Sequence, residues 1–233
     1  MQAIVLAGGR GERLRPFTAD RPKAMVEIRG TPLLAYQLRW LRHQGVTAVV
    51  IACGYRHEVI RDFFGDGGGW DLRISYSVEE EPLGRGGALK QAMHSLPADR
   101  DLCLATNGDI ITDLALAPVV EQHRRDGVPA TVVVTPFRSP YGIVEVDARN
   151  RVTGFREKPE LPYWINAGIY VFSREVLPLL PDRGDHEDTT FPQLAAQGRL
   201  GAYRSRAFWR GVDTAKDLME VARALEEGPL RPA

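Results

Sequence analysis

The stretch "AGGRGERLRPFTADRPKAM", residues 7–25, directly follows the apolar run Ala3 to Leu6 and decides the fold. A run this short and this apolar predicts a fully buried parallel strand. The glycines behind it predict a loop whose backbone can approach a phosphate closely, and the arginines bring positive charge to the same loop. Ligands bind at such strand ends in α/β proteins. A surface turn with solvated arginines is the alternative interpretation.

The chain alternates between apolar runs and amphipathic segments after this loop. Strands are predicted at 47–53, 72–78 and 102–106, and helices at 31–44, 57–64 and 83–96. This alternation predicts an α/β fold, a Rossmann-like, doubly wound, mostly parallel mixed sheet flanked by helices. The second half is richer in strands, helical stretches are predicted near 175–180 and 190–197, and an amphipathic helix is predicted at about 214–227.

No repeat, low-complexity tract or linker divides the chain. A length of 233 residues suits one large α/β domain, and we therefore expect a single domain over 1–233. Its N-terminal half extends to about residue 112 and its second half covers about 113–227, and a frayed tail is expected at 228–233.

The charge balance excludes two classes of partner. The 30 basic and 30 acidic residues give a formal net charge of zero, so we expect neither a nucleic acid nor an anionic membrane as partner. No stretch approaches the roughly 20 apolar residues that span a bilayer, and no charged leader precedes the first apolar run. Cys53 and Cys103 lie in apolar stretches, as buried thiols of a reducing compartment do. We expect a soluble cytoplasmic protein.

Several motifs in a fixed order carry a family resemblance. "LAGGRGERLRPFTADRPKAMVEIRGTPLL", residues 6–34, resembles the signature of the sugar-1-phosphate nucleotidylyltransferases, also called nucleotide-sugar pyrophosphorylases. Further matches cover nearly the whole chain: "EEPLGRGGAL" (80–89), "NGD" (107–109), "YGIVEVD" (141–147), "FREKP" (155–159), "NAGIYVF" (166–172) and "FWRGVDTAKDL" (208–218). The resemblance implies the nucleotide-diphospho-sugar transferase fold.

The resemblance also implies a reaction. A nucleoside monophosphate passes from a nucleoside triphosphate to a sugar 1-phosphate, pyrophosphate leaves, and a nucleotide sugar forms. Such an in-line transfer needs no protein nucleophile, because positioning and electrostatic stabilisation by cations and Mg²⁺ suffice. The N-terminal half is then the nucleotide-binding half, and the second half binds the sugar.

The resemblance also implies a role for each residue that matches a motif of the family. Arg13 is expected to hold the departing pyrophosphate, Lys23 to lie between the α-phosphate and the incoming sugar phosphate, and Asp109 to bind Mg²⁺. The expected nucleotide contacts are Leu6, Ala7, Gly8, Gly9, Arg10 and Gly11 in the loop, with Glu81, Gly86 and Gly87 near the base. The expected contacts of the sugar and its phosphate are Gly142, Glu157, Lys158 and Asn166.

The second metal ligand departs from the commonest family pattern. Many members read Trp-x-Asp-x-Gly-Thr, whereas this chain has Gly211 where that aspartate stands and Asp213 two residues later. A shift of two keeps the side-chain direction on an extended strand, so Asp213 is expected to face the cleft and bind Mg²⁺. The arrangement also resembles the glucose-1-phosphate cytidylyltransferases. The alternative is that Asp213 only caps the last helix.

The base and the sugar are less determined. "EEPLGRGGAL" with Asn-Gly-Asp is most similar to the guanylyltransferases that act on mannose or heptose 1-phosphates, which favours GTP. "PKAMVEIRGTP" and "ACGYRHEVI" are closer to the cytidylyltransferases, which makes CTP the alternative. A catalytically silent nucleotide-sugar-binding relative and a transferase with a non-sugar acceptor also stay open, as does a homo-oligomer. "DHEDTT", residues 185–190, is interpreted as a solvated loop that caps a helix.

Overall fold

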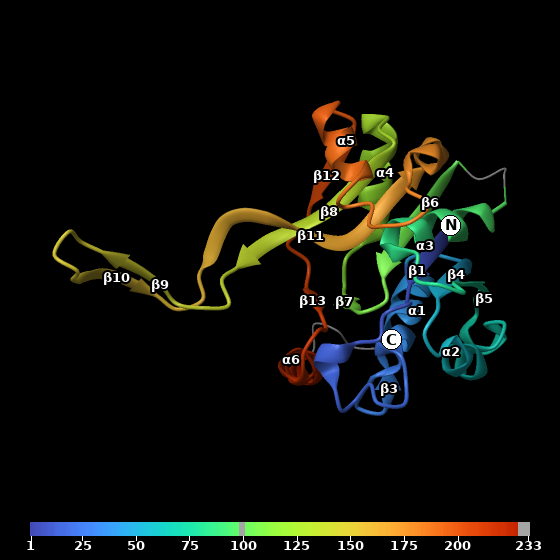
Figure 1. The fold of residues 1–233 in the computed structure, drawn as a ribbon, viewed down its shortest axis with the longest axis horizontal. Helices are drawn as coiled ribbons and strands as arrows, with labels where there is room; N and C mark the ends of the chain where they lie inside the picture. Colours follow the sequence, from blue (N-terminus) through green and yellow to red (C-terminus); the bar gives the residue numbers. More distant parts are fainter. Residues whose placement is uncertain (98–100, 228–233) are drawn as a thin grey trace.

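The computed structural model of the chain describes residues 1–97 and 101–227 (Figure 1). Its centre is a seven-stranded sheet in the order β12-β8-β11-β6-β1-β4-β5. Neighbouring strands are parallel, except that β11 is antiparallel to both of its neighbours. The predicted mostly parallel mixed sheet is therefore confirmed. The strands are β1 (Gln2–Leu6), β4 (Ala48–Cys53), β5 (Arg73–Val78), β6 (Leu102–Asn107), β8 (Ala130–Arg138), β11 (Glu160–Ser173) and β12 (Leu200–Arg204).

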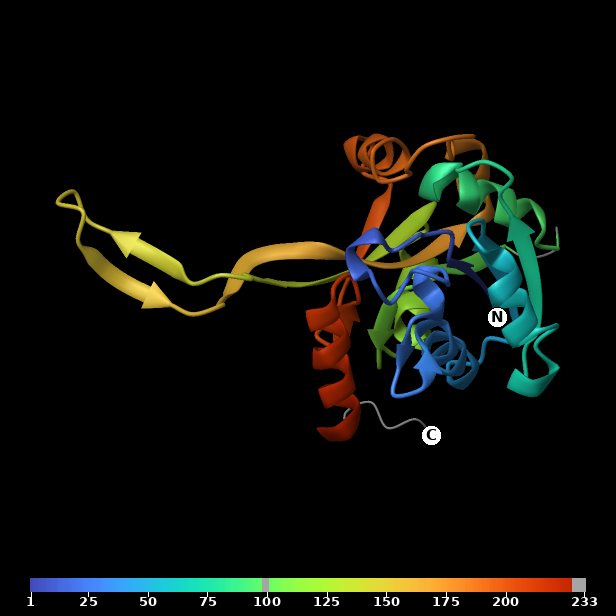
Figure 2. The ribbon, with the colours of Figure 1, turned by 60° about the horizontal axis from the view of Figure 1, so that its bottom comes forward.

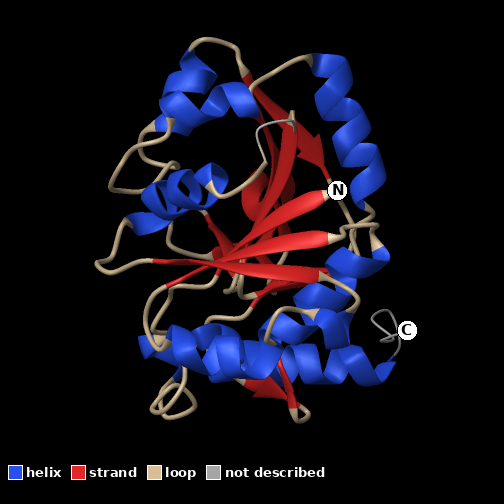
Figure 3. Cartoon of the chain, turned by 90° about the vertical axis from the view of Figure 1, so that its right-hand side faces the viewer, coloured by secondary structure: helices blue, strands red, loops and turns tan. Residues whose placement is uncertain are grey.

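Helices cover both faces of the sheet (Figure 3). Successive side chains of a strand point to opposite faces, so Ala3 and Val5 of β1 enter one hydrophobic core and Ile4 enters the other. The first core holds side chains of α1, α2 and α4, and the second holds side chains of α3 and α5. These helices are α1 (Leu33–His43), α2 (His57–Phe64), α3 (Gly84–His94), α4 (Leu116–Asp126) and α5 (Thr190–Ala196).

The strand order reverses between β1 and β6. From β1 the chain adds β4 and β5 on one side, and then returns to add β6 on the other side. Leu6 and Asn107 are partners at the carboxyl ends of these two parallel strands. Connections leave in opposite directions at such a point, which opens a crevice outside the strand ends.

The C-terminal segment returns to this crevice. Strand β13 (Trp209–Gly211) pairs with β7 (Ile110–Thr112), which follows β6 almost directly. Helix α6 (Ala215–Glu227) comes next and forms a third core with Leu14, Val26 and Ile28 of the N-terminal segment. A segment near the N-terminus and a segment near the C-terminus are thereby packed together beside this crevice.

A two-stranded arm projects from the body (Figures 1 and 2). It consists of β9 (Ile143–Val146) and β10 (Val152–Arg156), which pair only with each other. The arm continues from β8 and β11, whose paired outer parts form its stem. This separation from the body is a feature that the sequence motifs do not predict.

Three local assignments differ from the sequence prediction. Helix α4 was not predicted, although Leu116, Val119 and Val120 have helical spacing and are buried. The segment predicted as helical near 175–180 is a 3₁₀ helix, Arg174–Leu179, that contains Pro178. Residues 31–32 form the short strand β3 (Thr31–Pro32) with β2 (Glu27–Ile28), so α1 begins after the proline. The predicted frayed tail at 228–233 lies outside the described residues.

Candidate active site

A cleft of about 830 Å³ opens at the carboxyl ends of β1 and β6. This volume lies in the range of small-molecule and cofactor sites. Leu6 and Ala7 line the cleft at the end of β1, Asn107 and Asp109 line it at the end of β6, and Asn166 of β11 lies along the same wall. The topological switch point of the sheet and the cleft therefore coincide.

The glycine-rich loop that follows β1 lines one end of the cleft. Gly8 and Gly9 line the cleft, and within the described residues the amides of Gly8 to Gly11 have no backbone acceptor. Gly11 has a φ of 66°, and a Cβ there would lie 2.9 Å from Lys23 Cβ. Its carbonyl accepts a hydrogen bond from Thr18 Oγ1 at 2.9 Å. Backbone N–H groups that lack an acceptor within the protein can donate hydrogen bonds to the phosphates of a ligand.

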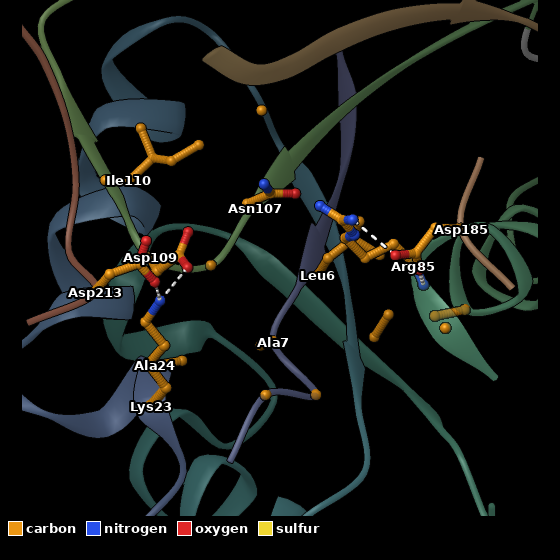
Figure 4. Close-up of a pocket in the computed structure, with 18 of the residues that line it drawn as sticks. Leu6, Ala7, Lys23, Ala24, Arg85, Asn107, Asp109, Ile110, Asp185 and Asp213 are labelled. Carbon is orange, nitrogen blue, oxygen red and sulfur yellow. Dashed lines mark hydrogen bonds and ion pairs between the residues drawn. The ribbon is translucent and has the colours of Figure 1, made fainter. Parts of the chain in front are cut away.

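Lys23 joins two facing carboxylates (Figure 4). Its Nζ lies 2.5 Å from Asp109 Oδ2 and 2.5 Å from Asp213 Oδ1, and Arg13 Nη2 donates to the same Asp213 oxygen at 2.8 Å. The Lys23 side chain is only 13% exposed. Burial acts to raise the pKa of Asp213, but the hydrogen bond and charge of Lys23, together with Arg13, hold it below its ordinary value. The structure thus brings together the four residues that the motifs assigned to the departing pyrophosphate, to the α-phosphate and to the metal.

The backbone fixes the two carboxylates opposite each other. Val212 N donates to Asp109 O at 2.9 Å, continuing the pairing of β13 with β7. The last helix is capped by Thr214 and Asp217, because Asp217 Oδ2 accepts from Thr214 N and Oγ1 at 2.8 Å. The side chain of Asp213 is therefore directed to the cleft and does not cap the helix. A Cβ at Gly211 would meet only Trp209 ring atoms at 3.7 and 3.8 Å, so nothing steric demands glycine there.

A second polar cluster lies at the other end of the cleft (Figure 4). Arg85 donates to Asp185 at 2.7 Å and to Glu187 at 2.9 Å. Tyr170 Oη joins Glu187 to Asn166, because it donates to the carboxylate at 3.3 Å and accepts from Asn166 Nδ2 at 2.9 Å. Burial raises the pKa of the Glu187 carboxyl. This network holds Asn166 in a fixed orientation against the cleft.

Three residues expected near the base lie outside the cleft lining. Glu81 is 77% exposed and pairs with Arg183 at 2.8 Å. Gly86 and Gly87 instead pack against the loop at 181–186, where a Cβ on Gly87 would lie 2.5 Å from Asp182 O. Their absence of side chains lets α3 approach this loop closely, so the motif reflects packing at these two positions.

Glu79, two residues before Glu81, is the glutamate of this segment that lines the cleft. It lines the cleft at the end of β5, and its Oε1 would lie 3.0 Å from a Cβ on Gly8. Its Oε2 accepts from Leu83 N at 2.9 Å, and burial raises its pKa. The sequence could have indicated this role, because Glu79 directly follows a predicted strand and side chains at such strand ends reach the crevice.

Three expected sugar-phosphate contacts lie at the base of the arm and do not line the cleft. Lys158 and Glu157 are 53% and 62% exposed and lie 3.6 Å apart. Gly142 is next to them, since a Cβ there would lie 3.0 Å from Glu157 Oε2. Asn166 is thus the one of the four that lines the cleft. Arg10, expected on the nucleotide, is exposed outside the lining and stacks 5.3 Å from the Tyr55 ring centre.

The interpretation of residues 185–190 as a solvated loop is wrong. Asp185 and Glu187 line the cleft, and His186 is fully buried against Tyr170 and Phe191. Burial lowers the pKa of His186 to about 4. A run of charged residues is typical of a surface loop, and only the ion pairs of Asp185 and Glu187 with Arg85 show that this segment lies at the cleft.

Comparisons with known proteins identify the family of the chain. The family model described as nucleotidyl transferase matches residues 2–228. The chain belongs to the nucleotidyl transferase family. The chain is 34% identical to a mannose-1-phosphate guanylyltransferase of Mycobacterium tuberculosis over 98% of its own length and 65% of that relative. It is 36% identical to a mannose-1-phosphate guanyltransferase of Aspergillus fumigatus over 94% of its length and 62% of the relative.

The fold of this nucleotidyl transferase has solved counterparts. Crystal structures of HddC from Yersinia pseudotuberculosis, alone and complexed with GMP-PN, superpose with a TM-score of 0.78 at 25% and 24% identity. Each alignment covers 96% of this chain and 99% of the other. These counterparts confirm the expected nucleotide-diphospho-sugar transferase fold. The chain spans less than two thirds of the length of the curated relatives. No described helix is long and apolar enough to cross a membrane.

Proposed function

We propose that this nucleotidyl transferase transfers GMP from GTP to a sugar 1-phosphate, releasing pyrophosphate and forming a GDP-sugar. The observation that carries the proposal is the convergence of Arg13, Lys23, Asp109 and Asp213 beside a loop of open backbone amides. Guanylyltransferase relatives at 34–36% identity support the reaction class. We expect the reaction to occur in the cytoplasm, because nucleoside triphosphates are available there.

The cations supply the electrostatic work of the reaction. The loop amides of Gly8 and Gly9 bind the triphosphate, and Arg13 neutralises the charge that builds on the departing pyrophosphate. Lys23 holds the α-phosphate and the attacking phosphate oxygen together. Two anions repel each other strongly in a partly dry cleft, so a preorganised cation between them lowers the barrier without changing its protonation state.

Asp109 and Asp213 have the chemistry of a Mg²⁺ site. The ion prefers oxygen ligands and is usually held by one or two carboxylates together with substrate phosphates and waters. These two carboxylates already converge on one cation, the Lys23 ammonium. Within the described residues no third His, Cys, Asp or Glu completes an all-protein site. Bound there, Mg²⁺ would neutralise phosphate charge.

Glu79 is our candidate for base selection. A carboxylate can accept two hydrogen bonds from adjacent N–H groups, and guanine offers N1–H beside its 2-amino group. Cytosine presents one amino group beside two acceptors, so a carboxylate pairs with it less well. Glu79 lies at the end of β5 and is half-buried, where a base would exclude water from it. The Asp185–Arg85–Glu187 cluster with Asn166 then faces the sugar hydroxyls.

The two halves of the chain serve one reaction. We treat 1–227 as a single domain in which the half to about residue 112 binds the nucleotide, and the half from about 113 binds the sugar phosphate. Asp109 comes from the first half and Asp213 from the second, so both halves contribute to the cleft. The first half alone would lack one of the two carboxylates of the proposed Mg²⁺ site.

Pyrophosphate release tests the proposal. Purified protein with Mg²⁺ is assayed with GTP, CTP, UTP, dTTP and ATP, each against hexose, heptose and amino-sugar 1-phosphates. We expect release that requires GTP together with one sugar phosphate. Asp109→Asn should reduce turnover by orders of magnitude, whereas Asp182→Asn, an exposed carboxylate paired with Lys90, should not.

Each other outcome selects an alternative. Release with CTP alone would favour a cytidylyltransferase and would remove Glu79 as the base-selecting residue. Binding of a nucleotide without release on any acceptor would favour the silent relative, and release with an alcohol phosphate would favour a non-sugar acceptor. Glu79→Gln should lower the preference for GTP over CTP, because its amide offers one acceptor and one donor where guanine needs two acceptors.

A further inference from the structure

The segment of residues 139–164, which is the β9–β10 arm together with its stem, leaves apolar surface uncovered. Seven of the eleven exposed large hydrophobic side chains of the described residues lie on it. Its four aromatic side chains, which are 37–76% exposed, present on the order of 500 Å² if each ring residue offers about 200 Å². The seven residues are Tyr141, Val144, Val146, Val152, Phe155, Tyr163 and Trp164.

The hairpin lacks support from its own body. β9 and β10 form a sheet of two strands, and neither pairs with any other described strand. An isolated two-stranded hairpin is marginally stable in water, and exposed apolar side chains concentrated on one projecting element are typical of an interaction site. The arm therefore requires a surface on which to pack.

The cleft is short of positive charge. Among the described cations that line it, Arg85 is held by Asp185 and Glu187. Arg13 is paired with Asp213, and Lys23 is paired with Asp109 and Asp213, so these two cations face a triphosphate, the phosphate of a sugar and two carboxylates. The two residues that the sequence motif assigns to the sugar and its phosphate, Glu157 and Lys158, lie outside the lining.

The chain's own arm is poorly placed to close on the cleft. Its stem is fixed by pairing of Glu160 with Arg138, by the bond from Ser139 N to Pro159 O at 3.0 Å, and by an ion pair of Glu160 with Arg206 at 2.9 Å. Lys158 lies beyond these contacts, up to roughly 26 Å along the extended strand from Asn166 at about 3.3 Å per residue. A bend at 139–142 and 157–159 would turn the hairpin about Lys158 and would not carry that residue to the cleft.

A second copy of the chain supplies what each copy lacks. One copy has an apolar arm without a surface to cover it, and the other has a cleft without the arm's charged base. We propose that the β9–β10 arm docks on a second copy and places Glu157 and Lys158 at the cleft of that copy. The exchange is reciprocal, so a two-fold pair satisfies both arms and closes the assembly. The assignment of these residues to the sugar phosphate rests on the proposed function.

Complementation between two inactive variants tests the shared site. Lys158→Ala removes the arm's cation, and Asp109→Asn disables the cleft. A mixed pair has one intact site, formed by the cleft of the first variant and the arm of the second. Equal mixing with subunit exchange should restore about a quarter of wild-type activity, since half of the pairs are mixed and each has one intact site of two. Closure within one chain predicts no recovery, and that result would overturn the proposal.

Cross-linking tests the arm without turnover. Gly9→Cys places a thiol in the cleft, where a Cβ meets nothing within 4 Å, and Lys158→Cys places one on the arm. The native Cys53 and Cys103 are buried. A disulfide or short bismaleimide link should double the mass on a non-reducing gel. A link within one chain, or no link, would contradict docking on a second copy.

Sedimentation supplies the third readout. The wild type should sediment as a dimer or a multiple of it, and Phe155→Asp on the arm should give monomers. Phe63→Asp, at an exposed ring on α2, should leave the assembly unchanged. A monomeric wild type refutes the arm proposal while leaving the proposed function intact. Conversely, a cross-linked dimer of the cysteine variant, combined with a wild type that shows no turnover on any substrate pair, would refute the function and retain the arm contact.

Discussion

Replacement of Lys23 by methionine should expose the repulsion between the two carboxylates of the cleft. Asp109 Oδ2 and Asp213 Oδ1 each lie 2.5 Å from the same ammonium, so they are at most about 5 Å apart. Two unit charges at this distance repel by about 3 kcal/mol at an effective dielectric constant near 20. The carboxylates are 28% and 42% exposed, and Arg13 still neutralises part of the charge. We expect a net loss of roughly 1–3 kcal/mol in the free energy of unfolding.

Chemical and thermal denaturation with EDTA or with Mg²⁺ provides the assay. A loss of about 2 kcal/mol corresponds to a fall in Tm of roughly 4–8 °C for a domain of this size. Mg²⁺ should recover most of this loss in Lys23→Met and should stabilise the wild type less, because a cation replaces the missing ammonium. The experiment needs no turnover, so it tests the site independently of the substrate.

Lys90→Met is the matched control. Lys90 is 22% exposed and pairs with a single carboxylate, Asp182, which is 93% exposed. Its loss creates no facing pair of charges, so the change should stay within about 0.5 kcal/mol and should not depend on Mg²⁺. Equal stability of Lys23→Met and wild type in EDTA would refute the argument. An equal Mg²⁺ response of Lys23→Met and Lys90→Met would also do so.

Three further predictions follow from local geometry. Gly87→Ala should destabilise the protein by more than about 2 kcal/mol in urea unfolding, because its Cβ meets backbone at 2.5 Å, whereas Gly9→Ala should cost under about 1 kcal/mol. His186 has a pKa near 4 in the fold and about 6.5 when unfolded, so the unfolded state binds its proton first as pH falls. Wild-type stability should drop by roughly 3 kcal/mol between pH 7 and pH 4 through this group, and His186→Leu should lack that part of the slope. In an Asp213→Asn background, Gly211→Asp should restore some pyrophosphate release, because the site has room for the side chain; no gain would mean that position 211 does not reach the metal.

The sequence alone determined the elements that local chemistry controls. The short apolar run from Ala3 to Leu6 predicts a buried strand, and the glycines that follow it predict a loop. The regular alternation up to Asn107 then limits the fold to a doubly wound sheet. The family resemblance assigned Lys23 and Asp109 to one site, and the position of Asp109 after the fourth predicted strand is consistent with a site at the carboxyl edge of the sheet.

Tertiary structure alone decided which charged residues share the cleft. Glu79 and Glu81 are two residues apart and chemically identical, yet one lines the cleft and the other pairs with Arg183 at the surface. Asp213 could cap a helix or face the cleft, and pairing of β13 with β7 selects the cleft. The arm's base leaves Lys158 outside its own cleft, although its motif is intact. Sequence spacing encodes local conformation and strand direction, whereas these choices depend on contacts between segments that are distant along the chain.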